Sequence, residues 1–230
     1  MNGGDGCFLG FSDSRTGVLA PIQVARPRNL APFGHIIGLF VALMVTLTAM
    51  DVQAADTIEG GFLRVVKPIA APEGFLEVCR QYGWACAVSD NTSVAEVDVL
   101  ALAESVNARI NTSTPQISDL SQYGTQERWA LPTGRGGDCE DIALLKKREL
   151  IAQGVAANRL LMATALDQNR EPHAVLVLRT RGGDLVLDNV RNQIRPWRDT
   201  GYSFLRMQDP DAPQNWNAVL AGGVFTQASL

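Results

Sequence analysis

The residues with the clearest chemistry surround a cysteine, in the run Gly136-Gly137-Asp138-Cys139-Glu140-Asp141. An apolar segment follows at once, which predicts a helix whose first turn carries the cysteine. Asp138 stands at the N-cap, where its carboxylate can accept from open backbone N–H groups, and Asp141 stands where a capping-box partner would lie. The positive end of the helix dipole favours a thiolate at Cys139. The run therefore predicts a thiol nucleophile at the start of a helix.

We expect this helix to run to about Ala152, because Gly154 suits the position just after a helix end. Its first half, residues 142–145, is apolar on all sides and is predicted to be buried. Its second half is charged and is predicted to be solvated: Lys146-Lys147-Arg148-Glu149.

A thiol nucleophile needs a base within hydrogen-bond reach and a third group that orients the base. The chain has two histidines, His35 and His173. His35 borders a segment that export would remove, so His173 is the expected base. It begins a predicted strand, residues 173–180, where its ring can face a cleft. A lone histidine is more often structural, and the cysteine run is what favours catalysis here.

Two aspartates in the returning strand of a predicted hairpin are candidates for the third group. Asp184 and Asp188 have even spacing, which places them on one face of a strand. Asp184 belongs to the turn, where aspartate is favoured for local reasons. Asp188 lies among apolar residues, where an unpaired carboxylate is costly. We therefore predict that Asp188 orients His173 through its second ring nitrogen.

Oxyanion stabilisation is expected from the backbone N–H of Cys139, since helix N-termini leave such groups open. A second donor is expected from the segment that approaches the helix, near Trp129.

Elsewhere the sequence predicts four further elements. These are a short helix and turn at residues 72–88, a long helix at 94–110, a loop at 112–125 and a strand at 159–166. The tail from Trp197 onward, with Tyr202, Phe204 and Trp216, is expected to cover the core and to end loosely.

The N-terminal part of the chain predicts export. Arg26 and Arg28 precede an uncharged apolar run at residues 36–50, and Val52-Gln53-Ala54 supplies small residues for a signal peptidase. We expect cleavage after Ala54, with residues 1–54 as N-terminal extension and signal peptide and 55–230 as the catalytic domain. The alternative is an uncleaved anchor, which the short run disfavours. The expected location is the periplasm or the exterior.

Composition and cysteine number agree with an exported enzyme. The 230 residues are 46% hydrophobic, which is enough for one domain with a core. Basic residues do not cluster, which excludes nucleic acid as an expected partner.

The cysteines predict one disulfide. Cleavage removes Cys7, and Cys79 and Cys86 flank a predicted turn. We therefore predict a disulfide between these two, which leaves Cys139 as the free thiol of the mature protein; the alternative is two small buried residues.

Several segments together resemble the bacterial transglutaminase-like cysteine proteinases, a family that includes the LapG-like periplasmic proteases. The similarity covers nearly everything from Pro72 to Trp216 and rests on GGDCEDIALLKKREL, HAVLVLRT, GDLVLDN and PW…TGYSFLRMQ…W. It implies an α+β fold with a papain-like, transglutaminase-like core, whose central helix carries the nucleophile and packs on an antiparallel sheet. It also implies a Cys-His-Asp triad, carried over to Cys139, His173 and Asp188.

The resemblance also implies partners. These are a protein substrate at the cell envelope, such as a surface adhesin, and an inner-membrane regulatory protein. One departure bears on the substrate: the segment between Trp129 and Cys139 is shorter than in the LapG-type pattern. It reads Pro132-Thr133-Gly134-Arg135 where that pattern has a glutamate after the proline. An adhesin substrate therefore does not follow from the resemblance alone.

The acids beside the nucleophile predict a cation. At about 7 Å and an effective dielectric of about 20, each negative charge costs the thiolate roughly 2 kcal/mol, whereas the helix dipole returns only about 0.3 to 2 kcal/mol. Either a protonated His173 or calcium bound by Asp138, Glu140 and Asp141 would offset these charges. Calcium dependence is also what the resemblance implies. The alternative is that the two aspartates only cap the helix and Glu140 is solvated.

Three functions fit the sequence. The first is a secreted cysteine endopeptidase that hydrolyses protein substrates through a thioester acyl-enzyme. The second is transglutaminase-type transfer of the acyl group to an amine. The sequence does not separate these two, because both use the same thioester. The third is a catalytically silent binding module of the cell envelope, which the complete triad disfavours.

Overall fold

An antiparallel sheet of seven strands forms the centre of the computed structural model, which describes residues 61–89 and 95–226. The strands lie in the order β1-β7-β6-β2-β3-β4-β5. Neighbours along the sheet pair in antiparallel fashion throughout. Their bounds are Lys67–Ile69 (β1), Leu160–Leu166 (β2), Pro172–Thr180 (β3), Gly183–Leu187 (β4), Arg195–Pro196 (β5), Ser203–Gln208 (β6) and Trp216–Ala221 (β7).

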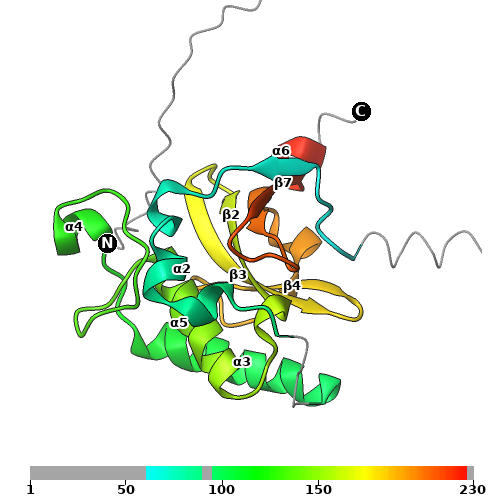
Figure 1. Cartoon of the computed structure of the whole chain (residues 1–230), viewed down its shortest axis with the longest axis horizontal. Coiled ribbons are helices and arrows are strands. Elements are labelled where there is room, and N and C mark those ends of the chain that lie inside the picture. The colour runs from blue at the N-terminus through cyan, green and yellow to red at the C-terminus, as the bar shows by residue number, and fades with distance from the viewer. Residues whose placement is uncertain (1–60, 90–94, 227–230) are drawn as a thin grey trace, which may run out of the picture.

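The long helices α3 and α5 lie side by side and cover one face of this sheet (Figure 1). The α-helices are Val78–Gln81 (α2), Glu96–Ser113 (α3), Asp119–Tyr123 (α4), Cys139–Ala152 (α5) and Gly223–Thr226 (α6). Single turns of 3-10 helix span Glu73–Phe75 (η1), Gly83–Cys86 (η2), Ala157–Arg159 (η3) and Trp197–Thr200 (η4). The fold is α+β, and its central helix begins at the cysteine, as expected.

The sheet is buried on both faces. In β2, Leu160 and Met162 join the apolar cluster beneath the helices, whereas Leu161 and Ala163 join a second cluster on the opposite face. The cause is the two-residue period of a strand, which sends successive side chains to opposite faces. Two-sided burial explains why β2 and β3 contain apolar residues almost without interruption.

Several expected elements are confirmed. The helix that begins at Cys139, α5, ends at Ala152, and Gly154 follows it with φ +92°, a conformation that suits glycine at this position. The long helix and the two strands before the hairpin turn are also present, within a few residues of their expected bounds.

The expectation for the C-terminal tail is wrong. Residues 203–208 and 216–221 form β6 and β7, and β6 lies between β7 and β2 inside the sheet. Polar residues in these strands hide the signal: Gln208 is fully buried because its side-chain amide bonds backbone groups of Met162, Ala85 and Pro213. The loop expected at residues 112–125 also contains a helix, α4, whose N-cap Ser118 accepts from the Ser121 N–H.

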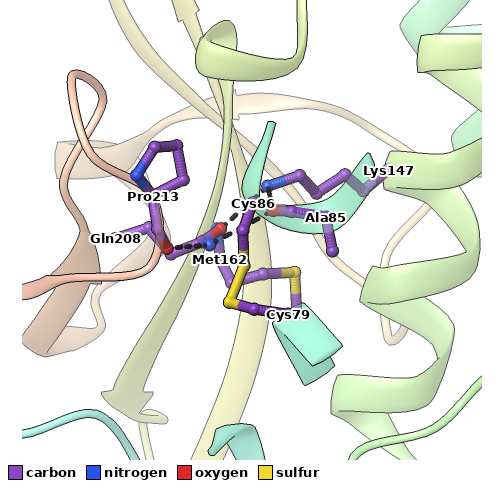
Figure 2. The surroundings of a disulfide bond; sticks show 7 residues. All are labelled: Cys79, Ala85, Cys86, Lys147, Met162, Gln208 and Pro213. Atoms are coloured by element: carbon purple, nitrogen blue, oxygen red, sulfur yellow. Dashed lines mark hydrogen bonds between the residues drawn. A yellow bond between two sulfur atoms is a disulfide. The ribbon is translucent and has the colours of Figure 1, made fainter. Parts of the chain in front are cut away.

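The second half of α5 is not solvated as expected. Lys146 and Lys147 are fully buried, because the sheet, α3 and η2 all contact this helix. The Lys147 ammonium donates to the Ala85 carbonyl (2.6 Å) and to Gln208 Oε1 (2.9 Å), as Figure 2 shows. Burial lowers the pKa of each lysine to about 7.

The predicted disulfide between Cys79 and Cys86 is confirmed, with the two Cα atoms 5.4 Å apart. It joins α2 to η2 and lies beside the Ala85 carbonyl that accepts from Lys147 (Figure 2). The disulfide therefore fixes the turn that covers the later part of the nucleophile helix.

The predicted signal peptide, residues 1–54, lies outside the described residues. Within the part of the chain that the structure describes, no helix has the length and apolarity needed to span a membrane.

Candidate active site

Cys139 is the first residue of α5 and is almost completely buried. Its Sγ accepts a hydrogen bond from the backbone N–H of Ala174 in β3 (3.1 Å). Glu140 Oε2 lies 3.2 Å from the same sulfur. A donated N–H and the helix N-terminus both favour negative charge on Sγ. The start of β3 thus lies against the start of α5.

His173 precedes Ala174 on β3, which brings its imidazole to the same region. Its Nε2 lies 3.0 Å from Oδ1 of Asp188, the residue just after β4, and both side chains are buried. With a proton on Nε2 the ring donates to the carboxylate and keeps Nδ1 as its second functional atom. The structure therefore brings the predicted base and the predicted orienting group together beside the cysteine-bearing helix.

Asp188 is held as a carboxylate by its neighbours. Burial by itself would raise its pKa, but the hydrogen bond and charge of His173, the Tyr202 hydroxyl and the Val190 N–H together lower the pKa below its usual value. The Tyr202 hydroxyl donates to Oδ2 at 2.5 Å. Burial, and then the Asp188 charge, raise the pKa of Tyr202. The aspartate is thus anionic and the tyrosine neutral near pH 7.

Asp184 has a different environment from Asp188. It forms a two-point ion pair with Arg179 across the hairpin (3.0 and 3.1 Å). Its Oδ2 also accepts from the Leu63 N–H at 2.9 Å. Asp184 thus ties the segment before β1 to β4.

The capping roles expected at the helix start are wrong. Asp138 is the N-cap residue, but its side chain makes no capping hydrogen bond; instead its Oδ2 accepts from the Asp119 N–H at 3.1 Å. Asp141 does not act as a capping-box partner either, because its Oδ1 accepts from the Ala130 N–H at 2.7 Å. Both carboxylates join neighbouring segments to the start of α5 and do not cap its backbone N–H groups.

A group of three buried carboxyl side chains could hold a metal ion: Asp119, Asp138 and Glu140 each offer an oxygen, all within 4.8 Å of one another. Asp141, expected as the third ligand, is not part of this group. Asp119 was not found from the sequence, because it lies in the stretch read as a loop and only the fold brings α4 to the start of α5.

The protonation of these acids follows from their burial. Burial, and then the charge of Asp138, raises the pKa of Asp119 to about 7. Burial, and then further acids nearby, raises the pKa of Asp141 to about 8, even though the Ala130 N–H lowers it. Burial also raises the pKa of Asp138, and raises that of Glu140 well above its usual value. Glu140 is therefore not solvated, and the cluster cannot carry its full negative charge near pH 7 without a cation.

Donors of the segment that approaches the helix are already bonded. The Trp129 indole N–H donates to Glu127 Oε1 at 2.6 Å. The backbone N–H of Ala130 donates to Asp141, and that of Leu131 donates to the Tyr82 hydroxyl at 3.2 Å. None of these three groups is open to serve as the expected second oxyanion donor.

The expected free thiol at Cys139 is not present in this structure: Cys139 is disulfide-bonded, and the described residues contain no free cysteine. The prediction of a thiol nucleophile concerns the mature protein, residues 55–230. The catalytic roles of Cys139, His173 and Asp188 stay predictions.

Comparisons with known proteins place these residues in a family. LapG of Legionella pneumophila in its calcium-bound form is 22% identical over 54% of this chain and 71% of that chain, with a TM-score of 0.46. Its EGTA-treated form is 20% identical over 62% and 83% of the two chains, with a TM-score of 0.42. A search of curated proteins gives no match. The model of the bacterial transglutaminase-like cysteine proteinases matches residues 65–223, so the chain belongs to that family of cysteine peptidases.

Proposed function

We propose that this chain is a periplasmic or secreted endopeptidase that hydrolyses protein substrates through a thioester on Cys139. The observation that carries the proposal is the placement of the His173–Asp188 pair beside the residue that donates to Cys139 Sγ. A positioned base with its own orienting carboxylate is what a thiol nucleophile requires.

The first half of the reaction forms the acyl-enzyme. His173 takes the thiol proton on Nδ1, and the Cys139 thiolate attacks the carbonyl carbon of the scissile amide. The new S–C bond forms, the C–N bond breaks, and the proton on Nδ1 passes to the departing amine. Asp188 accepts from Nε2 throughout and stabilises the imidazolium.

The second half releases the acid product. Water gives a proton to Nδ1 of His173 as its oxygen attacks the thioester carbon, and the C–S bond breaks to regenerate Cys139. If an amine attacks in place of water, the same residues carry out acyl transfer. Hydrolysis is the proposal because the family consists of proteinases.

Two features support the proposed periplasmic or secreted location. The predicted signal peptide directs the chain across a membrane, and the Cys79–Cys86 disulfide suits an oxidising compartment. The proposed substrates are proteins of the cell envelope, with a surface adhesin and an inner-membrane regulator as the partners that the family resemblance suggests.

Cleavage is tested with envelope proteins. Extracts from cells that lack this protein are incubated with mature wild type or with Cys139→Ser, and new protein N-termini are identified by mass spectrometry. We expect new termini with the wild type alone. A labelled primary amine added to the same mixture separates the two reactions: incorporation of the amine without new termini would replace hydrolysis by acyl transfer. If neither occurs, the silent binding module is the better description.

We further propose calcium as a cofactor, held by Asp119, Asp138 and Glu140. Asp119 Oδ1 and Asp138 Oδ1 are buried and have no hydrogen-bond partner among the described residues. Buried carboxylate oxygens grouped in this way are the ligands that calcium prefers, and calcium is the ion that the family resemblance suggests. When bound, the ion would neutralise the acids beside Cys139 and join α4 to the start of α5.

Calcium binding is tested by calorimetry on chelated protein, with magnesium as the comparison ion. Because Asp119 loses its proton only near pH 7, calcium must displace at least this proton in acid, and affinity should fall at least ten-fold per pH unit below 7. EGTA should reduce both activity and thermal stability. Asp119→Asn should weaken binding more than Asp141→Asn, since Asp141 lies outside the group. Absence of binding at millimolar calcium would refute the metal proposal and leave the peptidase proposal standing.

A further inference from the structure

Tyr202 contacts both members of the His173–Asp188 pair. Its hydroxyl donates to Asp188 Oδ2 at 2.5 Å, while His173 Nε2 lies 3.0 Å from the other oxygen, Oδ1. The edge of its ring meets the imidazole at 86°, with the ring centroids 5.5 Å apart. Tyr202, His173 and Asp188 are all nine-tenths buried or more. The tyrosine thus occupies the one carboxylate oxygen that the histidine does not use.

Tyr202 is itself firmly placed. It lies just before β6, and its backbone N–H donates to Thr200 Oγ1 at 3.1 Å. The Thr200 hydroxyl in turn donates to the Trp197 carbonyl at 2.7 Å. A short turn, η4, therefore fixes the tyrosine from a segment that follows the Asp188 hairpin and contacts β4.

The backbone of Asp188 is held from the opposite side by α3. Asn111 Nδ2 donates to the Asp188 carbonyl (2.8 Å) and to the Arg191 carbonyl (3.0 Å). The buried Asn107 donates to the Arg191 and Asn192 carbonyls, both at 2.9 Å. These contacts fix the chain at residues 188–192, while His173 and Val190 bond Oδ1 and the tyrosine hydroxyl bonds Oδ2 of the carboxylate.

We propose that Tyr202 is a positioning residue that holds the Asp188 carboxylate on Nε2 of His173, and so leaves Nδ1 unprotonated as the base for Cys139. The inference rests on the proposed peptidase function. A carboxylate can turn about its last bond, and Oδ1 also accepts from the Val190 N–H at 3.1 Å. A donor on Oδ2 prevents that rotation and fixes one imidazole tautomer, with the proton on Nε2.

Tyr202→Phe removes the hydroxyl and keeps the ring that packs on His173. The chain has two histidines and the predicted cleavage removes His35, so a ¹⁵N NMR spectrum of the mature protein holds the His173 imidazole alone. We expect the wild type to show His173 with its proton on Nε2, and Tyr202→Phe to show a mixture of both tautomers. We also expect kcat to fall roughly 10- to 100-fold with KM little changed, the range of a hydrogen bond to a charged acceptor.

Controls separate this inference from the function on which it rests. Tyr82→Phe removes another hydroxyl, whose partners are Leu131 and Gln81, and should leave the His173 spectrum unchanged. If Asp188→Asn leaves hydrolysis intact, the proposed triad fails. If Asp188→Asn abolishes hydrolysis while Tyr202→Phe changes neither tautomer nor kcat, only the role of Tyr202 is refuted. A fall in kcat with an unchanged tautomer would also refute it.

A second measurement applies if Tyr202→Phe does not fold. Growth with 3-fluorotyrosine makes each tyrosine hydroxyl a stronger acid and a stronger donor while keeping its shape. The proton resonance on Nε2 of His173 should then shift, because its acceptor is more strongly engaged on Oδ2. An unchanged resonance would refute the coupling.

Discussion

Replacing Lys147 by methionine should stabilise the protein at low pH and destabilise it slightly at high pH. Burial lowers the pKa of Lys147 from 10.5 to about 7. The unfolded chain therefore holds a proton that the folded protein has lost between these two pH values, and stability rises with pH across this window. At about 1.4 kcal/mol per pKa unit, the buried charge costs roughly 5 kcal/mol below pH 7.

Lys147→Met removes this cost and also removes two hydrogen bonds, each worth about 1 kcal/mol. Their acceptors keep other donors: Gln208 Nε2 donates to the Ala85 carbonyl (3.3 Å), and the Met162 N–H donates to Gln208 Oε1 (2.9 Å). The balance is a gain of roughly 3 kcal/mol at pH 6 and a loss of about 1 kcal/mol at pH 10.

Urea unfolding followed by tryptophan fluorescence at pH 6, 8 and 10, at fixed calcium, measures the difference between wild type and variant. Lys146 titrates in both proteins and cancels in the comparison. Lys67→Met, at an exposed position in β1, is the matched control and should give a small, pH-independent change. If the effect of Lys147→Met is equally independent of pH, the buried charge is not what limits stability.

Three further variants test the site and its support. Cys139→Ser should abolish hydrolysis by the mature protein without altering thermal unfolding, since a hydroxyl is far less acidic than a thiol; activity in this variant would exclude the cysteine as nucleophile. Asp188→Asn should lower kcat roughly 10²- to 10⁴-fold by favouring the wrong tautomer, whereas Asp184→Asn should cost about 1–3 kcal/mol of stability and keep kcat. The reverse ranking would refute the assignment. Serine at both Cys79 and Cys86 should lower the unfolding free energy by about 2–3 kcal/mol, and urea unfolding that matches the wild type would contradict this.

The parts of the site that could be predicted from the sequence are those with local signals. The helix start at Cys139 follows from a glycine pair, an N-cap residue and an apolar run. Apolar neighbours in the sequence favour Asp188 over Asp184 as the partner of His173, and Asp188 does bond His173; both carboxylates are buried, Asp184 against Arg179. Such inferences need no knowledge of distant segments.

Features that depend on distant segments escaped prediction. Asp119 joins the acids at the start of α5 only because α4 packs there. Tyr202 reaches Asp188 because β6 enters the sheet beside β2, although its strand has the polar residues of a surface segment. Lys146 and Lys147 belong to a run of charged residues that indicates a solvent-exposed turn of helix. Their burial follows from contacts of α5 with η2 and the sheet.

Helix α5 thus buries acidic side chains at its N-terminal end and basic side chains in its second half. Acids lie at its N-terminal end, where the helix dipole favours negative charge, and lysines lie further along. Burial moves both sets towards neutrality, since it raises the pKa of Asp119 to about 7 and lowers that of Lys147 to about 7. Among the described residues only the acids are grouped as metal ligands, so a cation could restore their charge; Lys147 has the Ala85 carbonyl and Gln208 Oε1 as acceptors instead. We therefore expect calcium and the Tyr202–Asp188–His173 contacts to act at the cysteine end of α5, because the acidic group includes Glu140 and His173 precedes the residue that donates to Cys139 Sγ.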